Sequence, residues 1–139
     1  MFMNTITADD EALLSKFETC ELPKSEFKHI QHIRAAWIIL SKDLLFSAMH
    51  RFRSDLKAYA VFNKVPALYN ETVTCFYLLL IRERMDKIGS EHSWEEFQAR
   101  NADLSLYPKM FLETYYPHEA AFSDQAKSVF LMPESAVAG

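Results

Sequence analysis

Apolar residues recur at helical spacing between Phe27 and Leu40. At about 100° per residue, five of them fall within one arc of a helix, and His29 falls inside the same arc with His32 at its edge. The apolar members of the arc are Ile30, Ile33, Ala36, Trp37 and Leu40. The pattern predicts an amphipathic helix that carries histidine on its buried face.

A second segment, Tyr69 to Ile81, is apolar on nearly all sides after its first turn. This composition is typical of a helix surrounded by others, so we expect it to be the central helix of the fold. The segment opens on a polar cluster, Tyr69-Asn70-Glu71-Thr72. We expect this cluster and His29 to meet in one polar pocket.

Local signals place the remaining helices. Thr7 precedes Asp10 at the spacing of a helix N-cap, and Pro23 ends that first helix. Ser25 is a candidate cap for the helix over 27–40, and Asp43 for a helix that runs to about Asn63. Further helices are expected at 70–87, 93–99, 105–116 and 123–130, and Ile88-Gly89 is a typical C-terminal stop. The third helix presents an apolar stripe made by Leu45, Met49, Phe52, Leu56 and Tyr59.

These elements predict an all-α, single-domain fold over residues 1–139. Four longer helices form a bundle, and short helices from Ser93 onward wrap around it. Residues 1–6 and 134–139 are expected to fray at the ends.

Composition narrows the function classes. Half of the 139 residues are apolar and only two are glycine, which favours a packed helical domain over disorder or a β-rich fold. The net charge is −4 and no basic stripe is present, so nucleic-acid binding is not expected. The longest apolar run, Cys75 to Ile81, is too short to span a membrane. The N-terminus has no basic region followed by an apolar run, so we expect a cytoplasmic protein. We expect Cys75 to be a buried, reduced thiol, and Cys20 and Cys75 do not form a metal motif.

The two histidines have the spacing of helical metal ligands. His29 and His32 lie three residues apart, so their rings can converge on one point, and Glu71 could add a carboxylate. Zn, Mn or Fe would accept such a set. The alternative is a buried His29 that is hydrogen-bonded to Glu71 or Tyr69 with no metal.

The same residues are candidates for catalysis and ligand binding. His29 and Glu71 could form a general base and its partner, although Glu71 could equally be an acid that only stabilises its helix N-terminus. Arg34 could bind a carboxylate or form an ion pair with Glu71, and Trp37 could line a pocket or belong to the core. His50 and His92 are expected to face solvent.

Two motifs resemble those of a family of small uncharacterised bacterial all-helical proteins. They are Phe27-Lys28-His29-x-x-His32-Ile33-Arg34-x-Ala36-Trp37 and Tyr69-Asn70-Glu71-Thr72-Val73-Thr74. Later segments with a similar likeness are Asn101-x-x-Leu104, Tyr115-Tyr116 and Phe130-Leu131-x-Pro133. The resemblance implies that His29, His32, Asn70 and Glu71 form one site. The family pattern has histidine where this chain has Asn70, which implies a weakened metal site or a small polar ligand.

Two functional hypotheses follow. The first is a protein whose pocket binds a small polar ligand or a divalent metal through His29, His32, Arg34, Trp37, Tyr69, Asn70 and Glu71. The second is a non-catalytic, self-associating helical module in which these residues form a buried hydrogen-bond network. The sequence does not decide whether a reaction is catalysed.

Overall fold

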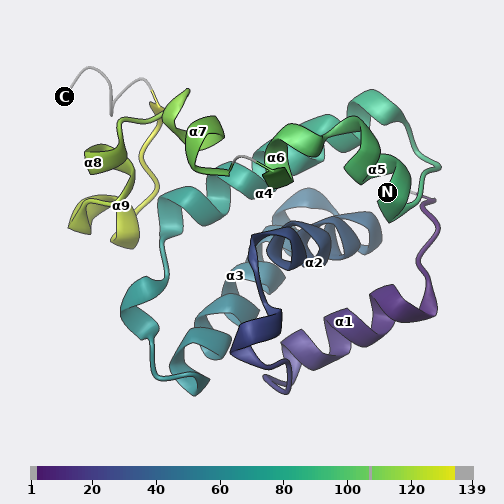
Figure 1. Ribbon diagram of the computed structural model, residues 1–139, viewed down its shortest axis with the longest axis horizontal. Coiled ribbons are helices and arrows are strands. Elements are labelled where there is room, and N and C mark those ends of the chain that lie inside the picture. The colour runs from purple at the N-terminus through teal and green to yellow at the C-terminus, as the bar shows by residue number, and fades with distance from the viewer. Residues whose placement is uncertain (1–2, 107, 134–139) are drawn as a thin grey trace.

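The computed structural model describes residues 3–106 and 108–133, and over this part of the chain the fold is all-α, as predicted (Figure 1). Four longer helices come first, followed by five short ones, with two 3-10 turns between them. The helices are α1 (Ala8–Glu18), α2 (His29–Lys42), α3 (Leu45–Phe62), α4 (Glu71–Ile88), α5 (Trp94–Arg100), α6 (Ala102–Leu106), α7 (Pro108–Glu113), α8 (His118–Ala121) and α9 (Asp124–Ser128), and the 3-10 turns are η1 (Lys24–Glu26) and η2 (Pro66–Leu68).

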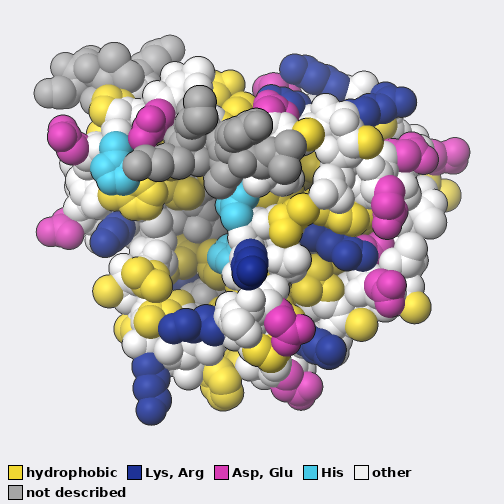
Figure 2. All heavy atoms as spheres, viewed as in Figure 1, with side chains coloured by type: hydrophobic (Ala, Val, Ile, Leu, Met, Phe, Trp, Pro, Cys, Tyr) yellow, Lys and Arg dark blue, Asp and Glu magenta, His cyan; other side chains and the backbone are white. Residues whose placement is uncertain are grey.

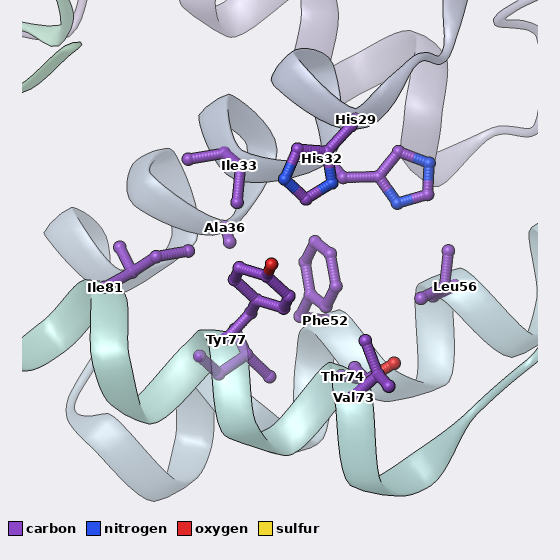
Figure 3. Close-up of a pocket in the computed structure, with 11 residues that line it drawn as sticks. His29, His32, Ile33, Ala36, Phe52, Leu56, Val73, Thr74, Tyr77 and Ile81 are labelled. Atoms are coloured by element: carbon purple, nitrogen blue, oxygen red, sulfur yellow. The ribbon is translucent and has the colours of Figure 1, made fainter. Parts of the chain in front are cut away.

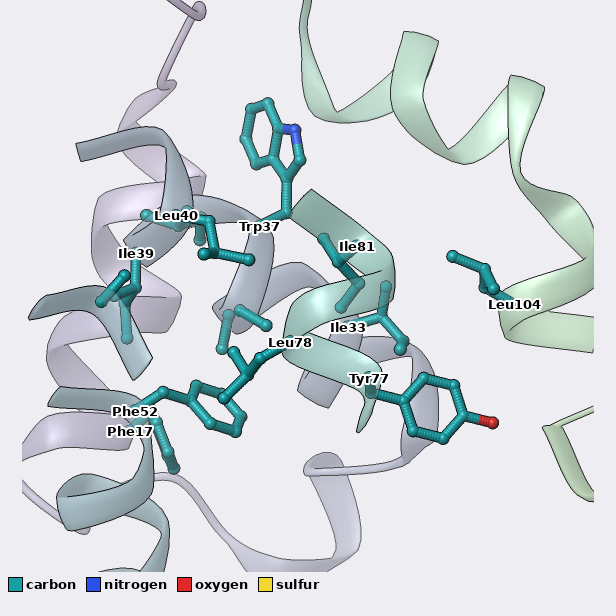
Figure 4. Close-up of a cluster of buried hydrophobic side chains, with 14 of the residues drawn as sticks. Phe17, Ile33, Trp37, Ile39, Leu40, Phe52, Tyr77, Leu78, Ile81 and Leu104 are labelled. Atoms are coloured by element: carbon teal, nitrogen blue, oxygen red, sulfur yellow. The ribbon is translucent and has the colours of Figure 1, made fainter. Parts of the chain in front are cut away.

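The central helix is α2, which packs against α1, α3 and α4 (Figures 1 and 4). Every side chain from Ala35 to Ser41 is buried, including Ile38, which lies outside the predicted apolar arc. α4 is less enclosed than predicted, because Leu79 is 40% exposed. The apolar middle of α4 therefore predicted more burial than this helix has, and the one-sided apolar arc of the 27–40 segment predicted less burial than α2 has.

Several predicted helix ends are confirmed. Thr7 and Asp10 form a reciprocal capping box at α1, and the side chain of Ser93 accepts from the backbone of Glu96 at α5. Gly89 ends α4 with a φ of 114°, a conformation that glycine adopts without a steric penalty. Two predicted caps are wrong. Ser25 lies in η1, so α2 begins only at His29, and α3 begins after Leu44 rather than Asp43.

The C-terminal short helices cover one side of α4, with α9 packed directly on it. Instead of one helix over 105–116, the chain forms α6 and α7, and residue 107 lies outside the described part. Thr72 anchors the segment after α9, since its hydroxyl donates to the Val129 carbonyl and accepts from the Leu131 amide. α8 was not anticipated by the sequence pattern.

Residues 3–5 are not frayed. The amides of Met3 and Thr5 donate to the carbonyls of Ser90 and His92, and the Asn4 side chain donates to Ser41 on α2. The predicted fraying of residues 1–2 and 134–139 lies outside the described residues. In the described part, no helix combines the length and the apolar character needed to cross a bilayer.

Candidate functional site

The first turns of α2 direct two histidines towards α4 (Figure 3). Nε2 of His29 lies 2.8 Å from the Leu104 carbonyl oxygen, and its ring meets Tyr77 edge-on with a centroid separation of 5.3 Å. Nε2 of His32 lies 3.2 Å from the Phe27 carbonyl oxygen, and its ring stacks on Phe27. Each imidazole is therefore fixed by one backbone carbonyl and one aromatic ring.

Both histidines are neutral at pH 7. Burial lowers the pKa of His29, and burial together with the nearby His29 lowers the pKa of His32 to about 4. A carbonyl oxygen only accepts hydrogen bonds, so Nε2 carries the proton in each ring. The remaining nitrogen, Nδ1, then bears a lone pair and acts as an acceptor.

The histidines line a set of three cavities that share Val73, which we call the Val73 groove (Figures 2 and 3). An inner cavity of about 90 Å³ lies between α2, α3 and α4. A cavity of about 370 Å³ lies beside it towards α7 and α8, and one of about 340 Å³ lies beside it towards η1 and η2. The two outer cavities fall within the range of about 300–1,000 Å³ found for small-molecule sites.

The walls of the groove are mainly apolar. Leu56 of α3, Val73 of α4 and Phe122 after α8 each line two or more of the cavities. Burial raises the pKa of Tyr77 to about 12, so its phenol stays protonated. The groove can therefore hold an apolar body and offers hydrogen-bonding groups at His29 and His32.

Glu71 does not join this site, and its predicted contact with His29 is not formed. Its two carboxylate oxygens accept from Nε and Nη2 of Arg53, and one of them also accepts from the Tyr69 hydroxyl at 2.6 Å. The Arg53 guanidinium holds the pKa of Glu71 below its usual value. Glu71 faces α3, whereas His29 is bonded to the backbone of α6.

The predicted metal ligands are likewise not brought together. Across residues 3–106 and 108–133, no group of three or more His, Cys, Asp and Glu side chains is placed to hold a metal ion, and His29, His32 and Glu71 are no exception. Asn70 instead caps α4 and links it to α8. Its Oδ1 accepts from the Val73 amide at the start of α4, and its Nδ2 donates to the Ala121 carbonyl at 2.7 Å. Asn70 and Tyr69 do line the outer cavity near η1.

Arg34 and Trp37 lie away from the groove. Arg34 forms an ion pair with Asp10, a fully buried carboxylate on α1, rather than with Glu71. Trp37 is fully buried, and its Nε1 donates to Nε2 of His92. The prediction that His92 faces solvent is wrong, because the residue is only 2% exposed and its ring lies against Trp37 and Phe97. His50 is exposed, as predicted.

Sequence reasoning missed the groove residues Val73, Tyr77 and Phe122. The first two follow the polar cluster at the start of α4 by one or two turns, on the side that faces His29. Their apolar character is equally typical of core residues. Only the structure shows that they line a cavity beside α8.

Comparison with known proteins gives no match to a family model, to a curated protein or to a solved structure. The resemblance to small bacterial helical proteins therefore stays a prediction.

Proposed function

We propose that this protein binds a small, mainly apolar molecule in the Val73 groove, with a hydrogen-bond donor of that molecule directed at His29 or His32. The observation that carries the proposal is that three neighbouring cavities share one wall residue, Val73, and that each is lined by His29, His32 or both. This revises the predicted polar ligand, because the polar partners expected from Arg34 and Glu71 are engaged elsewhere.

The chemistry of the walls supports this class of ligand. Burial of apolar surface contributes about 25 cal/mol per Å², so a flat or chain-like hydrocarbon would supply most of the binding free energy. The Nε2–H groups of His29 and His32 are already used by backbone carbonyls, which leaves Nδ1 as the group that can accept from a ligand. A hydroxyl or N–H donor would thus be preferred over a second acceptor.

A matched pair of aromatic probes tests the proposal. Carbazole and fluorene have nearly the same shape, but only carbazole carries an N–H donor. Fluorescence titration should give saturable one-to-one binding of both, with carbazole tighter by roughly three- to ten-fold, the worth of one hydrogen bond. The preference for carbazole should disappear in the double variant His29→Phe/His32→Phe.

A blocking variant locates the binding. Val73→Trp should fill the shared part of the groove and abolish binding, whereas Val129→Trp, at an exposed position outside the groove, should leave it unchanged. Thermal unfolding of both variants checks that they are folded. Absence of saturable binding to the wild-type chain, or equal loss in the two variants, would refute the proposal.

Exposed apolar side chains at the ends of α3 favour a second candidate, self-association. Phe46 is 81% exposed at the start of the helix and Phe62 is 65% exposed at its end. Large exposed apolar groups are frequent in protein–protein contacts. Light scattering after size-exclusion chromatography should then report a dimer that Phe46→Ser or Phe62→Ser dissociates, and a monomer at all concentrations would exclude this candidate.

A further inference from the structure

The two ends of the Val73 groove differ in charge. Lys24 of η1 lines the outer cavity near η1 and η2, whereas Glu113 lines the outer cavity near α7 and α8. The described residues that line the inner cavity include no charged group, since His29 and His32 are neutral. An elongated ligand would therefore meet a lysine at one end and a glutamate at the other.

At the positive end, none of the described acids forms an ion pair with Lys24. In the described part of the chain, Lys24 forms no ion pair, whereas the neighbouring cation Arg53 is bound by Glu71. The Lys57 ammonium lies 5.1 Å from the centre of the Tyr69 ring, which lines the same cavity, and adds a second positive charge nearby. The Glu26 charge acts on Tyr59, which lines the same cavity as Lys24, but Glu26 itself lines a separate hollow beside α1.

The interior of the groove disfavours an anion. The imidazoles present lone pairs rather than N–H groups, and a carboxylate placed against them would be both repelled and desolvated. Figure 2 shows the hollow with histidine side chains at its edge and Lys or Arg side chains beside it. An anionic head group is therefore expected at the rim, with the apolar body inside.

We infer that the ligand of the Val73 groove is an amphipathic monocarboxylate, with its carboxylate at Lys24 and its hydrocarbon part running past Val73. This inference rests on the proposed function and adds the charge and the orientation of the ligand. A hydroxyl along the hydrocarbon part would satisfy the imidazole acceptors without altering the position of the head group.

Calorimetric titration with three ligands of equal chain length tests the inference. Decanoate, decanol and decylammonium contain ten carbon atoms each and differ mainly in the charge of the head group. The wild-type chain should bind decanoate most tightly and decylammonium most weakly. Lys24→Glu should weaken decanoate binding by roughly five- to ten-fold, since it replaces an attraction with a repulsion, and should leave decanol binding unchanged.

Lys87→Glu is the matched control, because Lys87 is an exposed lysine at the far end of α4 and lines none of the three cavities. Its affinity for decanoate should equal that of the wild type. Equal binding of decanol and decanoate, tighter binding of decylammonium, or equal effects of the two lysine variants would overturn the inference and leave the proposed function intact. Failure of all three ligands to bind while carbazole still binds would overturn the inference alone, and failure of carbazole as well would overturn both.

Discussion

The indole Nε1–H of Trp37 donates a hydrogen bond of 2.9 Å to Nε2 of His92, and this bond joins α2 to the loop before α5. His92 in turn donates from Nδ1 to the Gly89 carbonyl at 3.0 Å. Both ring nitrogens are engaged in a side chain that is 2% exposed, so neither role can change without leaving a buried polar group unpaired.

A double-mutant cycle should detect the link between Trp37 and His92. Trp37→Phe and His92→Leu each remove one partner, and their combined effect on the free energy of unfolding should be smaller than the sum by about 1 kcal/mol or more. Urea unfolding measures each value. The control cycle pairs Trp37→Phe with His50→Leu on the exposed face of α3, where the effects should add within about 0.5 kcal/mol. Additive effects in the first cycle would contradict the assigned bond.

The buried histidines should make stability depend on pH. Burial lowers the pKa of His29 and His92, and that of His32 falls to about 4. The unfolded chain binds more protons than the folded chain below about pH 6.5, so this contribution to stability is present above that pH and is lost as the pH falls towards the folded values. For His32 we expect the free energy of unfolding to drop by about 1–2 kcal/mol between pH 7 and 5, and for His29 and His92 we expect a drop in the same direction.

Single substitutions should show which histidines cause the loss of stability at low pH. His32→Phe should reduce the loss of stability between pH 7 and 5, because the ring stack on Phe27 is kept while the proton site is removed. His50→Gln should leave the loss unchanged, since His50 is exposed. Chemical denaturation at several pH values measures the slope. A slope that the His32 variant does not alter would contradict the assigned pKa.

Glu71 should matter for stability and not for binding. Its ion pair with Arg53 joins α4 to α3, and its side chain is only 14% exposed. Glu71→Gln should cost about 1–2 kcal/mol at pH 7. Because its pKa is lowered in the folded chain, this contribution is present above about pH 4.3 and is lost as the pH falls below it.

Two comparisons make the Glu71 prediction specific. Glu83→Gln, which breaks an exposed pair with Lys87 on the same helix, should change stability by less than about 0.5 kcal/mol. Carbazole affinity should be the same in Glu71→Gln as in the wild type. A large loss of carbazole binding in Glu71→Gln would restore the predicted role of this residue in the site.

The helical architecture was largely predictable because its determinants are local. Thr7, Ser93 and Gly89 act within one turn of their own position, and the spacing of apolar residues fixes which face of a helix is buried. Local sequence patterns did not predict features that depend on packing between segments far apart in the chain. The part of α4 that follows its first turn is apolar on nearly all sides and predicted a central helix, yet α2 takes that place because α1, α3 and α4 surround it.

The partners of the site residues were not predictable for the same reason. Helical periodicity placed His29 on a buried face, but its hydrogen-bond partner is a carbonyl 75 residues away, at Leu104. Glu71 pairs with Arg53 because α3 lies antiparallel beside the start of α4, and no local feature of either segment specifies that pairing. Sequence patterns thus indicated which side chains are buried, while the tertiary packing decided what they contact.

The central claim is that an apolar molecule enters the groove at Val73, and a methyl NMR titration with carbazole tests it most directly. The methyl signals of Val73 and Leu56, which line the groove, should shift in a saturable manner, while those of Val61 and Val129, which lie outside it, should stay in place. No shift at Val73, or equal shifts at Val73 and Val129, would contradict the account.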